Sequence, residues 1–417
     1  MTLRADAPTP AGEKRFHALD AVRAFALLLG VVFHAAESFE PGVETYWAIA
    51  DSSPSHALGV FRHACHSFRL ELFFLIAGFF ARLLYHRRGR REFIRNRVSR
   101  ILVPLVVGWF ILYPLLVYLW LLGARAGGRL PQFGVPPEMA QTPPALLTLG
   151  FFATGQFVKR FDLTHLWFLH QLLVLYALAL PLRAAWHRWL DPAGARLARV
   201  DRFFAARCES RWKLLPLAAL TLPMLRLMDG WGVDTPKSAL LPHLPTTILY
   251  GWFFALGWLL HRQSRLLETL ARGWGLPLVV GLLAVWPAAS FVGWMRGLGF
   301  DPGREHWIRW GYSALYALMM WGLVLGTLGA FLRFCHAASP RWRYIADSSY
   351  WIYLVHLPLV VWLQIVVACW PLSWVVKWPL IIAVATPVLF LSYHHLVRPT
   401  FIGAQLNGRK YPRRPHP

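Results

Sequence analysis

An arginine and a histidine lie eleven residues apart in the first long apolar segment of this chain, residues 18–39. These residues are Arg23 and His34. Eleven helical steps of about 100° return nearly to the starting angle, so both side chains share one helix face, separated by about 16 Å along the axis. Charged groups inside a membrane-spanning helix are costly and normally mark a functional path. Glu37 and Ser38 follow His34 at helical spacing and add a carboxylate and a hydroxyl to this face.

A second group of basic residues precedes a later apolar segment. Arg97 and Arg100 are neighbours on a helix face, and planar guanidinium groups bind phosphates or carboxylates in bidentate fashion. With Arg23 at a similar depth, this pair predicts an anchor for an anionic donor molecule that arrives from the cytoplasm. The alternative is a positive-inside signal that only orients the helix.

Further polar and aromatic residues in apolar segments are candidates for a cavity that binds an acceptor. Arg69 and Glu71 are two residues apart and do not face each other, so each needs a partner elsewhere. A structural ion pair is the alternative for them. The other candidates are His165, Trp167, Tyr353 and His356. For these, the alternatives are interfacial anchoring of the tryptophan and ordinary burial of the histidines in the core.

The composition predicts an all-α polytopic transmembrane helix bundle. Of 417 residues, 57% are hydrophobic and 22 are tryptophan, and the mean hydropathy is +0.43, which is too apolar for one soluble core. Windows of about 20 apolar residues predict about ten spanning helices, near 17–38, 65–86, 98–122, 164–184, 212–229, 238–261, 274–296, 306–334, 345–369 and 374–397. The short apolar segment 144–157 is flanked by proline, which predicts a re-entrant or interfacial segment.

The net charge of +23 is explained by topology, because the arginines are concentrated in every second loop between the predicted spans. The arginine cluster at 87–91 lies in one of these basic loops, and the loops on the opposite side of the membrane carry fewer cations. The positive-inside rule therefore places both termini in the cytoplasm. The domain organisation is then a tail at 1–16, a transmembrane domain at 17–398 and a tail at 399–417. The basic excess contacts membrane lipids, and no nucleic-acid site is predicted.

The cysteines and histidines show no metal-ligand pattern. The four cysteines are scattered without CxxC spacing. His63 and His66 are three residues apart but have no third ligand of suitable placement. We therefore predict no metal site.

Several sequence blocks resemble those of the acyltransferase 3 family of membrane enzymes. The residues from Leu19 to Arg23, followed by His34, resemble the Arg-x10-His signature of the first helix of that family. The segment from Arg97 to Arg100 resembles its RxxR motif. Further family-like blocks are FFLIAGF at 73–79, HLWFL at 165–169 and SSYWIYLVH at 348–356. The resemblance spans nearly the whole chain.

The resemblance implies transfer of an acyl group from a cytoplasmic acyl-CoA to an acceptor hydroxyl on the far side of a bacterial inner membrane. The blocks at 70–80 and 165–178 look most like those of family members that succinylate periplasmic glucans. We therefore favour succinyl as the acyl group, succinyl-CoA as the co-substrate and a glucan or related polysaccharide as the acceptor, with no bound cofactor. Ala77 stands where family members often have serine, which removes any role for that hydroxyl.

Each candidate residue then has an expected role. Arg23, Arg97 and Arg100 hold the anionic end of the donor. His34 is the general base, because a neutral imidazole can take the proton of a sugar hydroxyl as the oxygen attacks the thioester. Glu37 orients the imidazole and stabilises its cationic form. Direct transfer and a covalent acyl-histidine relay both remain open.

Two other classes of protein share these features. Charged residues buried in many spans also occur in transporters, here of a glucan or an anionic metabolite. A non-catalytic membrane component of a glucan-synthesis complex would carry the same charges as structural ion pairs. The oligomeric state is left open by the sequence.

Overall fold

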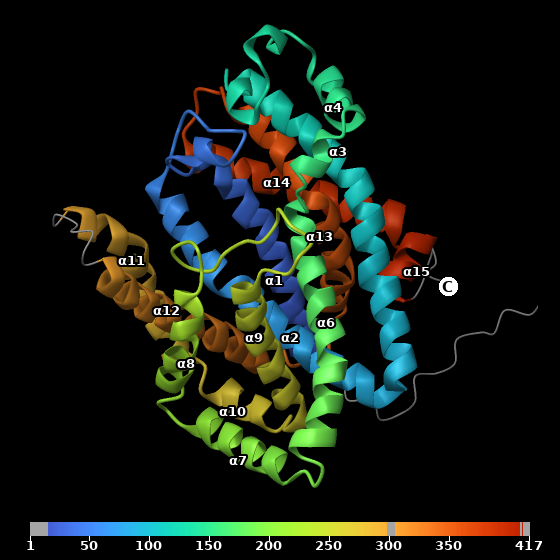
Figure 1. The fold of residues 1–417 in the computed structure, drawn as a ribbon, viewed down its shortest axis with the longest axis vertical. Helices are drawn as coiled ribbons and strands as arrows, with labels where there is room; N and C mark the ends of the chain where they lie inside the picture. Colours follow the sequence, from blue (N-terminus) through green and yellow to red (C-terminus); the bar gives the residue numbers. More distant parts are fainter. Residues whose placement is uncertain (1–15, 298–304, 409–410, 412–417) are drawn as a thin grey trace, which may run out of the picture.

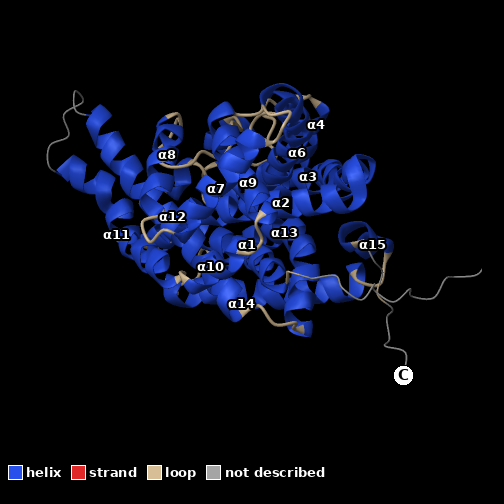
Figure 2. Ribbon diagram, turned by 90° about the horizontal axis from the view of Figure 1, so that it is seen from below, coloured by secondary structure: helices blue, strands red, loops and turns tan. Residues whose placement is uncertain are grey.

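The computed structural model describes residues 16–297, 305–408 and 411, and these residues form a helical bundle without a strand (Figures 1 and 2). The predicted all-α class is confirmed. The α-helices are α1 (His17–Ala36), α2 (His56–Arg97), α3 (Val103–Ala126), α4 (Pro144–Ala153), α5 (Gln156–Lys159), α6 (Trp167–Ala185), α7 (Ala195–Glu209), α8 (Leu214–Arg226), α9 (Leu244–Arg262), α10 (Leu266–Arg272), α11 (Gly275–Gly297), α12 (Glu305–Phe334), α13 (Pro340–Val367), α14 (Trp374–Ser392) and α15 (Phe401–Asn407).

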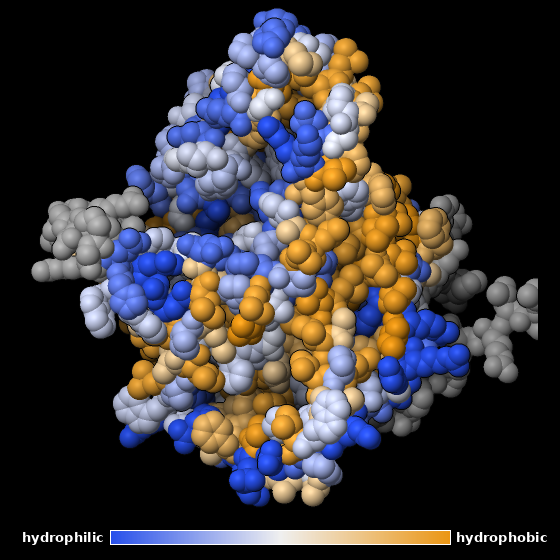
Figure 3. All heavy atoms as spheres, in the orientation of Figure 1, coloured by the Kyte–Doolittle hydropathy of each residue, from blue (hydrophilic) through white to orange (hydrophobic). Residues whose placement is uncertain are grey.

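Seven helical runs of the described chain are long and apolar enough to cross a membrane, so the protein is a multi-pass membrane protein. These runs are His17–Phe39, His56–Ala126, Thr164–Leu190, Gly275–Met295, Glu305–Phe334, Pro340–Val367 and Trp374–Val397. Figure 3 shows hydrophobic residues gathered over α3 and α6, with hydrophilic residues above and below them. Exposed apolar side chains of α3, such as Phe110 and Ile111, belong to this lipid-compatible surface.

The number of spans differs from the predicted ten for identifiable reasons. The run His56–Ala126 has 71 residues and contains the two predicted spans 65–86 and 98–122. The predicted spans 212–229 and 238–261 correspond to α8 and α9, which have 13 and 19 residues and are not among the seven runs. The count of ten spanning helices therefore stays a prediction.

The segment predicted to be re-entrant or interfacial contains the short helix α4. Its 10 residues rise about 15 Å, half the thickness of a bilayer core. Figure 1 shows α4 at one end of the molecule, beside the end of α3. This length agrees with a segment that does not cross the membrane.

Helix α1 lies in the interior of the bundle and packs against α13, α2 and α12. Small side chains permit this close packing: Ala21, Ala24 and Ala35 have no exposed surface. Because α1 is surrounded by other helices, its Arg23 and His34 face protein rather than lipid.

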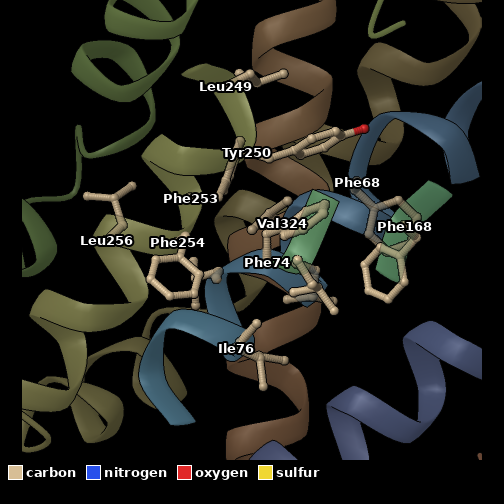
Figure 4. Packing of buried hydrophobic residues seen from close by; sticks show 14 of the residues in the cluster. Phe68, Phe74, Ile76, Phe168, Leu249, Tyr250, Phe253, Phe254, Leu256 and Val324 are labelled. Atoms are coloured by element: carbon tan, nitrogen blue, oxygen red, sulfur yellow. The ribbon is translucent and has the colours of Figure 1, made fainter. Parts of the chain in front are cut away.

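Helices α2 and α9 cross at two glycines. A Cβ at Gly78 would overlap the backbone of Phe254, and a Cβ at Gly257 would overlap the backbone of Leu75. Small residues of this kind allow two helix backbones to approach closely. Figure 4 shows the aromatic packing beside this crossing, where the rings of Phe74 and Tyr250 are 4.3 Å apart between centroids.

A glycine kink and a π-helical turn connect the second and third predicted spans. Gly89 has φ +74° and ψ 176° within α2, a conformation that side chains with a Cβ rarely adopt. A π-helical turn, Val98–Leu102, joins α2 to α3. These two features change the direction of the chain on either side of residues 90–97, next to the arginine cluster at 87–91.

Candidate functional site

Two cavities meet end to end inside the bundle. One has a volume of about 270 Å³ and contains His34, so we call it the histidine cavity. The other has a volume of about 770 Å³ and contains Arg23, so we call it the arginine cavity. They share three lining residues, Leu27, Phe73 and Phe168. The two cavities are therefore adjacent, and these three apolar side chains, which we call the apolar ring, line both of them.

The structure sorts the predicted site residues between these cavities. The residues that line the histidine cavity are His34, Glu37, Arg69, His165, Trp167, Tyr353 and His356. The residues that line the arginine cavity are Arg23, Arg97 and Arg100. Glu71 lines neither, which corrects its predicted place on the cavity wall: two helical steps turn it about 200° from Arg69. Its carboxylate is fully buried and has no hydrogen-bond partner among the described residues.

His34 and Glu37 form a hydrogen-bonded pair where α1 ends. His34 Nδ1 lies 2.8 Å from Glu37 Oε2. A carboxylate only accepts hydrogen bonds, so Nδ1 carries a proton, and in the neutral imidazole Nε2 then keeps its lone pair. Within the described chain, Nε2 has no hydrogen-bond partner. This tautomer and the open Nε2 are what a general base requires.

Arg62 supports the other side of the Glu37 carboxylate. Its Nη2 lies 3.8 Å from Glu37 Oε1, and its Nη1 pairs with Glu40 and lies 2.5 Å from the hydroxyl of Tyr46. Burial, followed by the charge of Glu37, raises the pKa of Tyr46. The Tyr46 phenol therefore stays protonated and donates to Glu40 at 2.6 Å.

The sequence reasoning missed Arg62, although the sequence contained a signal for it. Arg62, His66 and Arg69 follow one another at spacings of four and three residues, which places them on one helix face. All three line the histidine cavity. A polar stripe of this kind in a membrane-spanning helix indicates a cavity wall.

A buried glutamine fixes the end of α1. The last carbonyls of a helix lack the usual partners within the helix. Gln364 Nε2 donates to the carbonyl of His34 at 2.8 Å, and Trp47 Nε1 donates to Gln364 Oε1 at 3.1 Å. Gln364 has no exposed surface. The position of the catalytic candidate thus depends on α13 and on the loop that follows α1.

Pro358 explains how His165 is held. Proline has no N–H, so the carbonyl of Leu354, four residues earlier, loses its donor within the helix. His165 Nε2 takes that place and donates to the Leu354 carbonyl at 2.9 Å. Tyr353 Oη donates to the carbonyl of His165 at 2.8 Å. These two bonds join the start of α6 to α13.

His356 presents an unused nitrogen next to His34. Its Nδ1 donates to the carbonyl of Tyr353 at 2.7 Å, and in the neutral ring Nε2 then keeps a lone pair. Nε2 is buried and has no partner within the described residues. The His34 and His356 rings are 5.2 Å apart between centroids. Two imidazole lone pairs are thus available in one cavity.

The arginine cavity collects five arginines. They are Arg23, Arg87, Arg88, Arg97 and Arg100. Arg23 pairs with Asp20 at 3.2 Å, and Arg97 donates to Tyr176 Oη at 3.2 Å. Asp347 is the only carboxylate among the described lining residues, and Tyr411 donates a hydrogen bond to it. The cavity is therefore strongly electropositive.

Arg87 and Arg88 were missed as lining residues because sequence analysis treated them as part of a cytoplasmic signal. The kink at Gly89 follows them directly. Arg95 lies four residues beyond this cluster and does not line the cavity: it is 78% exposed and pairs with Glu92 at 2.9 Å. This basic end of α2 therefore contains both cavity residues and solvent-facing residues.

A helical membrane bundle with an open imidazole beside an electropositive cavity is the arrangement expected of a membrane-embedded transferase. The profile of the acyltransferase 3 family, described as an acyltransferase domain, matches residues 16–394, and this chain belongs to that family of acyltransferases. The family resemblance of the sequence is thus confirmed.

Individual relatives make the comparison more specific. Glucans biosynthesis protein C of Salmonella agona (strain SL483) is 25% identical over 355 residues, which cover 83% of this chain and 82% of the relative. The protein of the same name from Salmonella typhi is 24% identical over the same shares. No solved structure matches the chain.

Proposed function

We propose that this protein is an inner-membrane O-acyltransferase, with both termini cytoplasmic, that modifies hydroxyls of a periplasmic glucan or related polysaccharide. The acyl donor is a cytoplasmic acyl-CoA, and succinyl-CoA is the favoured one. The name of the relatives supports a role in glucan biosynthesis. The main structural support is that the open Nε2 of His34 lies in a cavity that adjoins the arginine cavity.

The arginine cavity suits the anionic end of coenzyme A. Its volume is nearly three times that of the histidine cavity, and guanidinium groups bind phosphates through paired N–H donors. The pantetheine arm is long, thin and weakly polar. It would pass between Leu27, Phe73 and Phe168 and place the thioester at His34.

The proposed reaction follows from the tautomer of His34. The acceptor hydroxyl oxygen attacks the thioester carbon while His34 Nε2 takes the hydroxyl proton. The carbon–sulfur bond then breaks, and the imidazolium returns this proton to the departing thiolate. Glu37 stabilises the imidazolium through Nδ1, and Arg62 holds Glu37. The open Nε2 of His356 accepts a hydrogen bond from an acceptor hydroxyl.

The same geometry permits a covalent relay in which Nε2 of His34 attacks the thioester itself. The two routes differ in whether an acylated protein exists without acceptor. Intact-protein mass spectrometry of the purified enzyme with succinyl-CoA alone distinguishes them: a mass gain on His34 establishes the relay, and an unmodified protein that transfers once glucan is added establishes direct transfer.

Mass spectrometry of periplasmic glucans, with and without this protein, tests the proposed function. We expect a mass increment of one or more acyl groups that disappears in the His34→Ala variant, with a loss of about 10²- to 10⁴-fold in rate. The exposed His395 provides a control, and His395→Ala should retain the increment. Glucan transport in vesicles without acyl-CoA consumption would establish a transporter instead. Unchanged glucan acylation in both Arg23→Ala and His34→Ala would establish a structural component.

A further inference from the structure

Arg69 is a cation of the histidine cavity that has no ion-pair partner. Among the described lining residues, the other cations at this end are paired: Arg62 with Glu37 and Glu40, and Lys237 with Asp162 at 3.6 Å. In the part of the chain that the structure describes, Arg69 has neither an ion pair nor a hydrogen bond, and its Nε is buried without a partner.

The contacts of Arg69 leave its donors free. Its guanidinium lies over the ring of Phe33, with Cζ 4.5 Å from the ring centroid. An aromatic face stabilises a guanidinium but does not accept its in-plane N–H donors as a carboxylate does. An unpaired charge away from bulk water is costly. A ligand that brings a negative charge to Arg69 would remove this cost.

A glycine on α1 makes room for this guanidinium beside the reacting centre. A Cβ at Gly30 would lie 2.9 Å from Arg69 Nη1 and 3.8 Å from His356 Nε2. Gly30 precedes His34 by one helical turn, about 6 Å along the axis. The guanidinium therefore lies within the reach of a short chain whose other end is at His34.

The identity of the anion follows from where the other charges are. The phosphates of an acyl-CoA belong to the arginine cavity in the proposed function, beyond the ring of Leu27, Phe73 and Phe168. The glucose units of an unmodified glucan are neutral. Glu37 is the only carboxylate among the described residues that line the histidine cavity, and His34 and Arg62 already engage it. The remaining source of negative charge is the acyl group.

We propose that Arg69 binds the terminal carboxylate of a dicarboxylic acyl group while its thioester carbon lies at His34. This inference rests on the proposed function and adds a specificity determinant to it. The enzyme selects succinyl-CoA over acetyl-CoA because the neutral acyl group leaves the Arg69 donors unpaired, and unpaired buried polar groups are a strong source of discrimination.

Transfer assays with the full chain in proteoliposomes test this assignment, using neutral glucan with succinyl-CoA or acetyl-CoA. We expect Arg69→Gln to lower kcat/KM for succinyl-CoA by about 10²-fold and for acetyl-CoA by less than about threefold. Arg82→Gln is the matched control, because Arg82 lies on the same helix, bonds to His261 and lines neither cavity. It should leave the ratio of the two donors unchanged.

The other outcomes are distinguishable. Equal loss with both donors would assign Arg69 to the developing oxyanion and overturn the inference. An effect seen only with an anionic, phosphorylated glucan would assign it to the acceptor and also overturn it. If Arg69→Gln does not fold, Arg69→Lys decides: the KM for succinyl-CoA should rise more than that for acetyl-CoA. A wild-type protein that transfers neither acyl group would defeat the proposed function itself.

Discussion

His34 and Glu37 are joined by a 2.8 Å hydrogen bond between Nδ1 and Oε2 at the point where α1 gives way to a 3-10 turn. The bond fixes one tautomer and leaves Nε2 open to the cavity. The carboxylate also stands where it would stabilise positive charge on the ring. This relationship links the local end of a helix to the proposed proton transfer.

Glu37→Gln should lower kcat by about 10- to 100-fold and leave the KM for acyl-CoA within twofold, because the amide keeps the shape but not the charge. Glu37→Asp should recover part of the loss. Steady-state transfer assays provide both constants. Glu44→Gln, at an exposed residue outside the cavity, is the control. A parallel rise in KM in Glu37→Gln would indicate a structural role instead.

Arg97→Ala and Arg100→Ala should each raise the KM for acyl-CoA by about 10- to 100-fold, because each removes charge-assisted hydrogen bonds to the donor. Arg95→Ala should have no such effect, since that side chain is 78% exposed and faces away. Acyl-CoA titrations in transfer assays measure all three. Equal KM values for the three variants would contradict an anionic donor in the arginine cavity.

Leu27→Trp should block transfer, because Leu27 belongs to the apolar ring that both cavities share and a tryptophan fills the space between them. Binding of CoA in the arginine cavity should persist. Equilibrium binding of CoA and a transfer assay report the two properties separately. Leu27→Ala, which widens the passage, should still transfer. Full activity of Leu27→Trp would mean that the thioester reaches His34 by another route.

Lys377→Met should destabilise the protein by about 3–5 kcal/mol, because it leaves a buried carboxylate without its partner. Lys377 has no exposed surface and donates to Asp51 at 2.9 Å. Thermal unfolding of the detergent-purified protein measures the change. Adding Asp51→Asn should recover part of the loss, and the exposed Lys159→Met should change stability by less than about 0.5 kcal/mol. A loss in the double variant as large as in Lys377→Met would contradict this account.

The sequence by itself determined the helical class and much of the site. Hydrophobic windows of membrane length are a local property, so apolar residues alone predicted the α-class bundle. The spacing of Arg23 and His34 is also local, because a helix fixes which residues share a face. The same geometry paired His34 with Glu37, which the structure shows as a hydrogen bond.

Only the tertiary structure decided which distant residues share a cavity. The partnership of Gln364 with His34, the bond from His165 to Leu354 and the place of Arg62 depend on how α2, α6 and α13 pack around α1. The sequence alone also does not place Glu71 outside the histidine cavity or Arg87 in the arginine cavity. Which side of a buried helix faces a space and which faces a neighbouring helix depends on the packing of the whole bundle, to which residues far apart in the chain contribute.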